Sequence, residues 1–308
     1  MGSGDLDVIA EKIRISAPDR EVFVVSNNET SFRIRKKAAL LPTLLFSIGP
    51  LAAFKPRRGK IYCGHAFSKI QQLERLNAAG VPLPKWAVLE PSSYFDRDEW
   101  GETVVVKPTG AGAAAQGRGV QFVETKGVEF IRPEDFPRRH VGTRGPMIVQ
   151  KFVDSGECPS EFRVVCLFGT PLYAVKHTSG QPMPVAYKKY ILDDPLDLAS
   201  SNKVKKYGYG GKTRGTDFVD DPVLLETASS TYSAIPEAPL HGVDLVREKD
   251  TGKYYVMEAN PMGFTWHFSS YFAGVPHPTF NGMRREEQFD AFSIAANVLI
   301  ERTRKEAE

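Results

Sequence analysis

Short apolar runs typical of β-strands dominate the chain from residue 100 onward. They are bounded by glycine or proline and read ETVVVKP, GVQFVE, MIVQKFV, EFRVVCLFG and LYAVKH. This punctuation predicts short strands, and the FGTP turn between the last two runs predicts a hairpin. From 178 to 216 the sequence becomes polar and rich in lysine and glycine. A connection of this length in a compact domain predicts a mobile loop that closes over bound substrate.

Helical periodicity appears in three segments. In SKIQQLERLNAAG, at 68–80, Ser68 is the predicted N-terminal cap and Gly80 the predicted end of the helix. The second predicted helix is DPVLLETASSTYSA, at 221–234. The third is RREEQFDAFSIAANVLIERTRK, at 284–305, an amphipathic helix whose predicted inward residues are Phe289, Phe292, Ala296 and Leu299 or Ile300.

The N-terminal third alternates apolar runs (EVFVVS, TLLFSIG, KIYCG) with charged or helical stretches, which predicts a small α/β layer. Within it, AALLPTLLFSIGPLAAF at 38–54 carries no charge, as a membrane span would. It is shorter than the about 20 residues that a span needs, and Pro42, Gly49 and Pro50 interrupt it. We therefore expect a buried strand around 44–48 and no membrane partner.

Composition narrows the class of protein. With 308 residues the chain is long enough for two or three small domains, and its three cysteines, without a C-x-x-C pair, argue against disulfides and a zinc site. The first twenty residues are too charged for a signal peptide, so we expect a cytoplasmic protein. The net charge of +3 is too small to indicate a nucleic-acid partner, although clustered lysines and arginines suit anionic ligands.

The segment HGVDLVREKDTGKYYVMEANP contains two strand-like runs around DTG. These three residues predict a hairpin loop in which Gly252 takes the left-handed conformation. If Lys249 faces Lys253 across this loop, Asp244 lies directly opposite Glu258. The sequence therefore predicts two facing carboxylates.

Asn260 follows Glu258 by two residues, so it lies on the same face of the hairpin as Glu258 and Asp244. Like charges opposite one another destabilise a sheet unless a cation lies between them. Two carboxylates and an amide oxygen suit Mg²⁺, which completes its coordination with water and substrate phosphates. The alternative is a solvent-facing hairpin edge with incidental acids.

A glycine-rich loop follows the strand VVVKP, which ends at Lys107. Its glycines are Gly110, Gly112, Gly117 and Gly119. Backbone N–H groups in such a loop can turn toward phosphate oxygens because no side chains obstruct them. Arg118 within it is either a solvated tip or a γ-phosphate clamp, and the loop itself is either a phosphate cradle or a plain turn.

These motifs, in this order over residues 60 to 305, resemble the ATP-grasp superfamily, and within it the ribosomal-protein glutamate ligase-like branch of carboxylate-amine ligases. The pieces are SKIQQLERLNAAGVPLPKW, VVVKP, MIVQKFV, SEFRVV, and GVDLV with VMEANP. The resemblance implies an α/β (α+β) fold in which two α+β subdomains grip ATP. The implied domains are 1–66, an abbreviated α/β layer; 67–150, with the phosphate loop; and 151–308, with the metal site and the substrate loop 178–216.

The resemblance also implies roles for individual residues. To the phosphate contacts predicted in the loop, Gly112, Gly117 and Arg118, it adds Lys69 and Lys107 for phosphate, Gln150, Lys151 and the Val153 backbone for adenine, and Glu161 for ribose. Asp244, Glu258 and Asn260 would hold Mg²⁺. Arg163 and Lys107 are the implied catalytic residues, beside the phosphoryl group that reacts.

The implied activity is that of an ATP- and Mg²⁺-dependent ligase. ATP would phosphorylate a carboxylate to an acylphosphate, and the amine of an amino acid or peptide would displace the phosphate. Two alternatives stay open: an ATP-grasp kinase whose product keeps the phosphate, and a non-catalytic ATP-binding regulatory protein. The substrates and the oligomeric state, including a homo-oligomer, also stay open.

The histidines His177, His241 and His267 are scattered along the sequence, so no catalytic histidine is expected. Trp266 and His267 follow the predicted metal ligands closely. A substrate could lie at this position, and the role of the two residues stays open.

Overall fold

The computed structural model of the chain describes residues 4–25, 32–51, 58–109, 119–138, 140–180, 182–183, 185–190, 192, 213–261, 265–266, 268, 279–280 and 282–307, with the backbone alone at 213–214. Most of the predicted substrate loop and most of the glycine-rich loop lie outside these residues.

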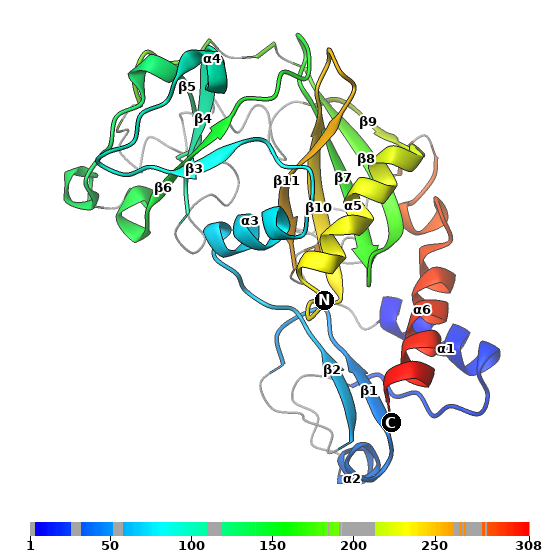
Figure 1. Cartoon of the computed structure of the whole chain (residues 1–308). Coiled ribbons are helices and arrows are strands. Elements are labelled where there is room, and N and C mark those ends of the chain that lie inside the picture. The colour runs from blue at the N-terminus through cyan, green and yellow to red at the C-terminus, as the bar shows by residue number, and fades with distance from the viewer. Residues whose placement is uncertain are drawn as a thin grey trace.

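Two antiparallel sheets and one small parallel sheet make up the described strands (Figure 1). The four-stranded sheet runs in the order β3 (Trp86–Val88), β6 (Met147–Lys151), β4 (Thr103–Pro108), β5 (Gln121–Glu124). The five-stranded sheet runs in the order β11 (Tyr254–Asn260), β10 (Leu240–Arg247), β7 (Ser160–Leu167), β8 (Thr170–Ser179), β9 (Thr213–Phe218). The parallel pair is β1 (Thr43–Phe46) with β2 (Gly59–Tyr62).

Helices accompany all three sheets, so the predicted α/β (α+β) class is confirmed. The α-helices are α1 (Gly4–Ser16), α2 (Phe32–Leu40), α3 (Lys69–Ala78), α4 (Arg97–Trp100), α5 (Pro222–Ala234) and α6 (Ala291–Glu306). The short 3-10 helices are η2 (Thr125–Gly127), η3 (Pro133–Asp135), η4 (Val141–Arg144) and η7 (Arg285–Glu287). The sequence had not predicted α1. Among the described residues, no helix has the length and apolar character that crossing a membrane requires.

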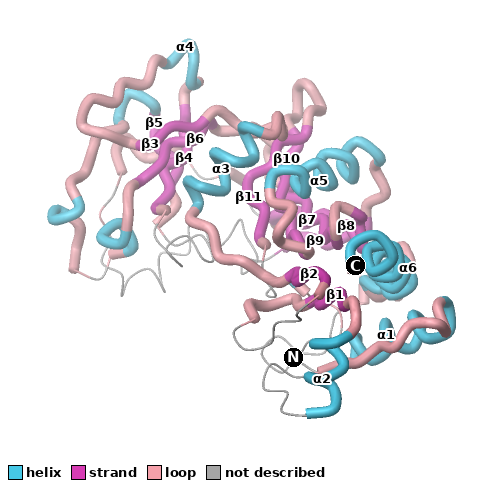
Figure 2. Tube along the Cα trace, turned by 60° about the horizontal axis from the view of Figure 1, so that its bottom comes forward, coloured by secondary structure: helices cyan, strands magenta, loops and turns pink. Residues whose placement is uncertain are grey.

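The five-stranded sheet is the centre of the molecule and is covered on both faces. Helices α3 and α5 lie over one face, where Phe162 and Val164 of β7 are buried. Helix α6 lies over the other, where Val165 and Leu167 of the same strand are buried, and α1 packs against α6. Successive strand residues alternate between faces, so β7 contributes to both cores. In Figures 1 and 2, α3 lies between the two larger sheets.

The four-stranded sheet has one apolar face and one mixed face. Val104 and Val106 of β4 point into a core that includes Trp100 of α4. The alternate residues Val105 and Lys107 therefore lie on the other face. Gln150 of β6 is the partner of Val105, so it shares that face.

Helix α3 begins and ends as predicted. Ser68 is the N-cap, with its Oγ accepting from Gln71 N at 3.2 Å while Ser68 N donates to Gln71 Oε1 at 3.1 Å, a capping box. Gly80, with φ +72°, follows the helix. The helix packs on α5 and β11. The predicted domain boundaries at 66/67 and 150/151 stay predictions. Helix α3 belongs to the predicted domain 67–150, although it packs against β11 and α5 of the predicted domain 151–308.

The predicted hairpin of β7 and β8 is confirmed, with Leu167 paired to Thr170. Both turn residues have positive φ, +49° at Phe168 and +80° at Gly169, as a tight hairpin turn requires. This conformation is strained for phenylalanine. Phe168 is 6% exposed and packs edge-on against Tyr62 at 4.8 Å between ring centroids, so its burial offsets the strain.

The hairpin of β10 and β11 has the predicted partners but a different loop. Asp244 pairs with Glu258. Glu248 N donates to Lys253 O at 2.9 Å, so the loop is Lys249–Gly252 and Lys249 does not face Lys253 as predicted. A bulge beside Asp244 restores the predicted pairing, because an extra residue in β11 shifts the register by one.

The apolar run EVFVVS is not part of a strand at 21–25. One other prediction is corrected. The C-terminal helix begins at Ala291 rather than near 284, because Asp290 has the left-handed φ of +52°. Of its predicted inward residues, Ala296 is buried and Phe292 packs against the same core. The three cysteines are free thiols, as expected.

Candidate active site

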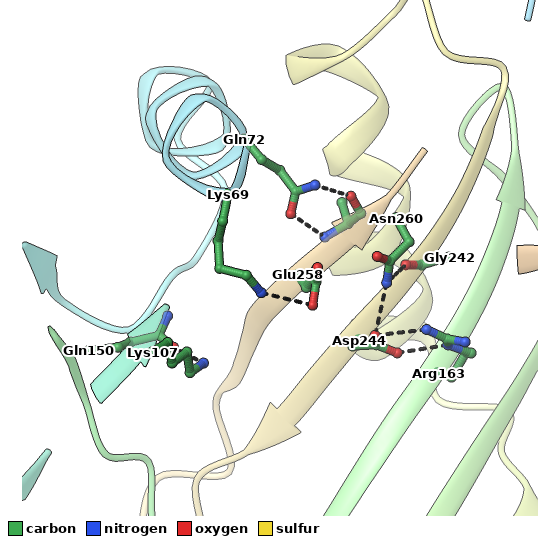
Figure 3. A network of polar contacts seen from close by, with 10 residues as sticks. Lys69, Gln72, Lys107, Gln150, Arg163, Gly242, Asp244, Glu258 and Asn260 are labelled. Carbon is green, nitrogen blue, oxygen red and sulfur yellow. Dashed lines mark hydrogen bonds and ion pairs between the residues drawn. The ribbon is translucent and has the colours of Figure 1, made fainter. Parts of the chain in front are cut away.

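The predicted metal ligands lie together on one face of the hairpin edge. Asp244 is the cross-strand partner of Glu258, and Gly242 is the partner of Asn260 (Figure 3). Asn260 Nδ2 donates to Asp244 Oδ2 at 3.1 Å and to Gly242 O at 3.4 Å. A Cβ at Gly242 would lie 2.3 Å from Thr265 Cγ2, so only glycine fits there.

Arg163 neutralises the first of these carboxylates. It lies directly opposite Asp244 across the pair of β7 and β10. Its Nε and Nη2 donate to Asp244 Oδ1 and Oδ2 at 2.7 and 2.8 Å, a bidentate pair. Burial raises the pKa of Asp244 above its usual value, and Arg163 acts against this rise. Asp244 is thus a carboxylate whose charge depends on a cation beside it.

Lys69 neutralises the second carboxylate, Glu258. It is the first residue of α3, and its Nζ lies 3.1 Å from Glu258 Oε2. Burial acts to raise the pKa of Glu258, but the charges of Lys69, Lys107 and Arg163 outweigh it and the pKa is lowered. The facing carboxylates predicted from the sequence are therefore each balanced by a side-chain cation of the protein.

Lys107 faces this group from the four-stranded sheet. Burial, and then the charge of Lys69, lowers the pKa of Lys107 to about 7. Its Nζ donates to Gln150 Oε1. Gln150 is 1% exposed, and within the described residues its Nε2 is a buried donor that has no hydrogen-bond partner. Buried polar groups are normally hydrogen-bonded, so this unused donor is consistent with a site that binds a polar ligand.

The low pKa of Lys107 predicts a pH-dependent stability that Lys107→Met removes. Between pH 7 and 10.5, the unfolded state binds this proton and the folded state does not, so the free energy of unfolding rises with pH in that window. Relative to the variant, the wild type should gain about 1 kcal/mol per pH unit. Denaturant unfolding of both proteins at several pH values measures this difference, and parallel curves would contradict it.

Glu161 and His177 extend the site face along β7 and β8. They are cross-strand partners, and Glu161 shares the face of Arg163 because it lies two residues away on β7. Burial and then Asp244 raise the pKa of Glu161 to about 7. Burial and the charges of Arg163 and Arg285 lower the pKa of His177 to about 4, which keeps its ring neutral at pH 7.

His177 is a site-face residue that sequence reasoning missed. Its Nδ1 lies 2.9 Å from Thr216 Oγ1 of β9, which fixes the ring orientation. Only the pairing of β7 with β8 places it opposite Glu161, and its isolated position in the sequence gives no such signal. His241, by contrast, is buried on the opposite face, where Nε2 lies 3.2 Å from Ile235 O.

Gln72 is a second residue that the sequence did not single out. It lies one helical turn after Lys69 on α3, and is 5% exposed. Ala259 N donates to Gln72 Oε1 at 3.0 Å, and Gln72 Nε2 donates to Ala259 O. Figure 3 shows both contacts reaching across to β11. The helical spacing of Gln72 would suit a core position as well as a site position. The sequence pattern therefore does not identify it as a site residue.

The side chain of Lys151, a predicted adenine contact, is not brought to this face. Lys151 pairs with Val104 on the apolar side of its sheet, and its Nζ donates to Glu99 O at 3.1 Å, so only its backbone stays a predicted adenine contact. Val153 is buried. The predicted phosphate contacts that lie outside the described residues are Gly112, Gly117 and Arg118.

Trp266 does not lie where a substrate was predicted to bind. It is 3% exposed and belongs to the core under α1 and α6. Its Nε1 donates to Asp5 Oδ2 at 3.0 Å, which ties this segment to α1. A buried indole with its N–H satisfied is a core residue. His267 lies outside the described residues.

The donor set fits Mg²⁺ only in part. Within the described residues, no group of three or more histidine, cysteine, aspartate or glutamate side chains is placed to hold a metal. Asp244, Glu258 and Asn260 provide two carboxylates and one amide oxygen, which suit a hard cation that takes its other ligands from phosphates and water. In this structure, the carboxylates of Asp244 and Glu258 pair with Arg163 and Lys69. The cationic groups of Arg163 and Lys69 therefore lie beside the oxygens that would bind the metal.

No protein-family model and no curated protein matches the chain. Among solved structures, it is similar to the D-cycloserine synthetase DcsG, with 17% identity over 98% of this chain and 95% of that chain, at a TM-score of 0.49. It is also similar to a D-alanine–D-alanine ligase from Bacillus anthracis, with 16% identity over 100% of this chain and 94% of that chain, at a TM-score of 0.44.

A further similar structure is the ATP-grasp ligase PsnB in complex with Mg and ADP. The identity is 16%, the TM-score is 0.40, and the match covers 77% of this chain. The chain spans a little over half the length of PsnB, 58%.

Proposed function

We propose that the protein is an ATP- and Mg²⁺-dependent ligase of the ATP-grasp type, which forms an amide bond between a carboxylate and an amine through an acylphosphate. One observation carries this proposal. Three cations, Lys69 of α3, Lys107 of β4 and Arg163 of β7, converge on the two carboxylates of the β10–β11 hairpin, Asp244 and Glu258. Lys69 and Arg163 already neutralise these carboxylates. Such a group matches a polyanion bound with a divalent metal.

The ion pairs suggest what each side chain does. Asp244, Glu258 and Asn260 would hold Mg²⁺, which when bound would neutralise and orient the phosphates. Lys69 and Arg163 would then be free to turn from the carboxylates to phosphate oxygens. Each of these side chains is only 12–13% exposed, so their charges act in surroundings where water screens them little. Positioning and charge neutralisation, more than proton transfer, would be the protein's contribution.

The nucleotide would bind along the mixed face of the four-stranded sheet. The unused Nε2 donor of Gln150 would meet an acceptor on adenine, next to the Val153 backbone. Lys107 would exchange its contact with Gln150 for phosphate, and phosphate binding would restore its proton, because a nearby anion favours the charged amine. Glu161 would contact the ribose. Gly112, Gly117 and Arg118 stay predicted phosphate contacts.

The experiment that tests this function has two stages. First, isothermal titration with ADP in the presence and absence of Mg²⁺ measures whether the metal strengthens nucleotide binding. Second, release of ADP and phosphate from ATP is measured with single amino acids and short peptides as candidate carboxylates and amines. We expect Mg²⁺-dependent nucleotide binding and stimulated ADP release with a matched pair of substrates. Absence of nucleotide binding with Mg²⁺ would refute the proposal.

A further inference from the structure

Gln72 is hydrogen-bonded to β11, the strand that carries two of the proposed metal ligands, Glu258 and Asn260. Among the described strands, β11 is at the edge of the sheet, so no described strand pairs with its outer N–H and C=O groups. Gln72 supplies a donor and an acceptor to the backbone of Ala259 there, as a strand would. Its side chain is nearly inaccessible, 5% exposed, so solvent does not compete for these bonds.

Ala259 is the residue between Glu258 and Asn260. Its own side chain is fully buried in the core beneath α3 and α5, which directs the side chains of its two neighbours to the opposite face. A rotation or shift of the backbone at Ala259 would therefore move both proposed ligands together. The two bonds to Gln72 restrain that movement.

The same helix carries the cation of the site. Lys69 and Gln72 are three residues apart, so they lie on one side of α3. Lys69 approaches the side chain of Glu258 at 3.1 Å, while Gln72 contacts the backbone of the next residue. The clasp by Gln72 thus sets the distance between the lysine and the carboxylate, because it fixes the helix against the strand.

We propose that Gln72 is a positioning residue for the metal and phosphate groups, acting through the backbone of Ala259. This inference rests on the proposed function, since it requires that Glu258, Asn260 and Lys69 bind Mg²⁺ and phosphate. Loss of a residue that supports metal ligands typically lowers metal affinity by about 10–100-fold. Loss of Gln72 should therefore weaken the binding of Mg²⁺ with nucleotide more than it weakens nucleotide binding alone.

The chain offers a matched control in Gln288, which makes the same kind of clasp elsewhere. Gln288 Oε1 accepts from Ala174 N at 2.8 Å, and its Nε2 donates to Val219 O at 2.9 Å. Both backbone groups belong to or follow strands β8 and β9, away from the proposed ligands. Methionine at either position keeps the length of the side chain and removes both hydrogen bonds.

The experiment compares Gln72→Met and Gln288→Met in the full chain. ADP affinity is measured by titration with and without Mg²⁺, Mn²⁺ binding in the presence of ADP is followed by electron paramagnetic resonance, and stability by denaturant unfolding. Both variants should lose stability. We expect Mn²⁺ affinity to fall about 10–100-fold in Gln72→Met alone, with metal-free ADP affinity changed less than threefold.

Equal Mn²⁺ affinities in the two variants would overturn the positioning role, whatever their stabilities. Should Gln72→Met fail to fold, Gln72→Asn, which keeps the amide but retracts it by one methylene, replaces it with the same expected fall. A wild type that binds no ADP with either metal would instead overturn the proposed function itself. The two failures are therefore distinguishable.

Discussion

Glu258→Gln is expected to lower ATP turnover at least a hundredfold while leaving the fold intact. Glu258 is the carboxylate that accepts from Lys69 at 3.1 Å and lies opposite Asp244. Glutamine keeps the shape of the side chain but removes its charge. The proposed magnesium site would then have one carboxylate ligand instead of two. Changing a residue that only supports metal ligands typically lowers metal affinity or activity by about 10–100-fold, and loss of a charged ligand should lower it more.

The fold should survive this substitution because two effects oppose each other. The ion pair with Lys69 is lost, but the repulsion between Glu258 and Asp244 is also relieved. Both carboxylates are about a third exposed, which limits each effect, so we expect the free energy of unfolding to change by less than about 1 kcal/mol.

Coupled measurement of ADP release, together with denaturant unfolding, tests both expectations. Glu226→Gln is the control, since Glu226 is exposed on α5 and the same change of charge there should leave turnover unchanged. Near-normal ATP consumption by Glu258→Gln would remove the metal assignment. Unfolded protein would show instead that the ion pair with Lys69 is structural.

Local patterns allowed much of the fold to be predicted. The capping box and following glycine of α3 are local, so both its ends were predicted correctly. The pairing of Asp244 with Glu258 was also predicted, although the loop was not. Loop length and bulge compensate each other by one residue, and the alternation of buried positions, rather than the turn, determines which side chains share a face.

Contacts between distant segments could not be predicted in this way. The pairing of β7 with β10 places Arg163 on Asp244, and it joins residues 81 positions apart. The clasp of Gln72 on Ala259 joins residues 187 positions apart. Neither follows from periodicity, because a polar residue inside a helix or strand is equally consistent with solvent exposure. Trp266 was misplaced for the same reason: its partner, Asp5, is in α1, a helix that was not predicted.

Arg163→Ala is expected to remove the ATP-dependent formation of a hydroxamate from the true carboxylate substrate. Arg163 is 12% exposed and donates twice to Asp244, so it is held at the centre of the charged group. In the proposed reaction it would stabilise charge that develops on the transferring phosphoryl group. Loss of one such donor typically costs about 10²–10³ in rate.

Arg163→Lys provides the matched comparison because it keeps the charge and loses the bidentate fork. We expect it to recover part of the rate lost in Arg163→Ala and part of its stability. Among the described residues, alanine would leave the half-buried Asp244 with the hydrogen bond from Asn260 alone. Titration with ADP separates binding from chemistry. Equal rates in wild type and Arg163→Ala, at equal nucleotide occupancy, would contradict the catalytic role.

Hydroxylamine decides between the two reactions that these charges could serve. An acylphosphate is a reactive anhydride, so hydroxylamine should intercept it and give a hydroxamate together with ADP and free phosphate. A phosphorylated alcohol is a stable ester that hydroxylamine leaves intact. The residues of the site would suit either product, because in the proposed reaction Lys107, Arg163 and the paired carboxylates would act on the phosphoryl group and not on its acceptor. Hydroxamate formation that depends on ATP and on Arg163 would establish the ligase, whereas phosphate retained on the product without any hydroxamate would establish the kinase.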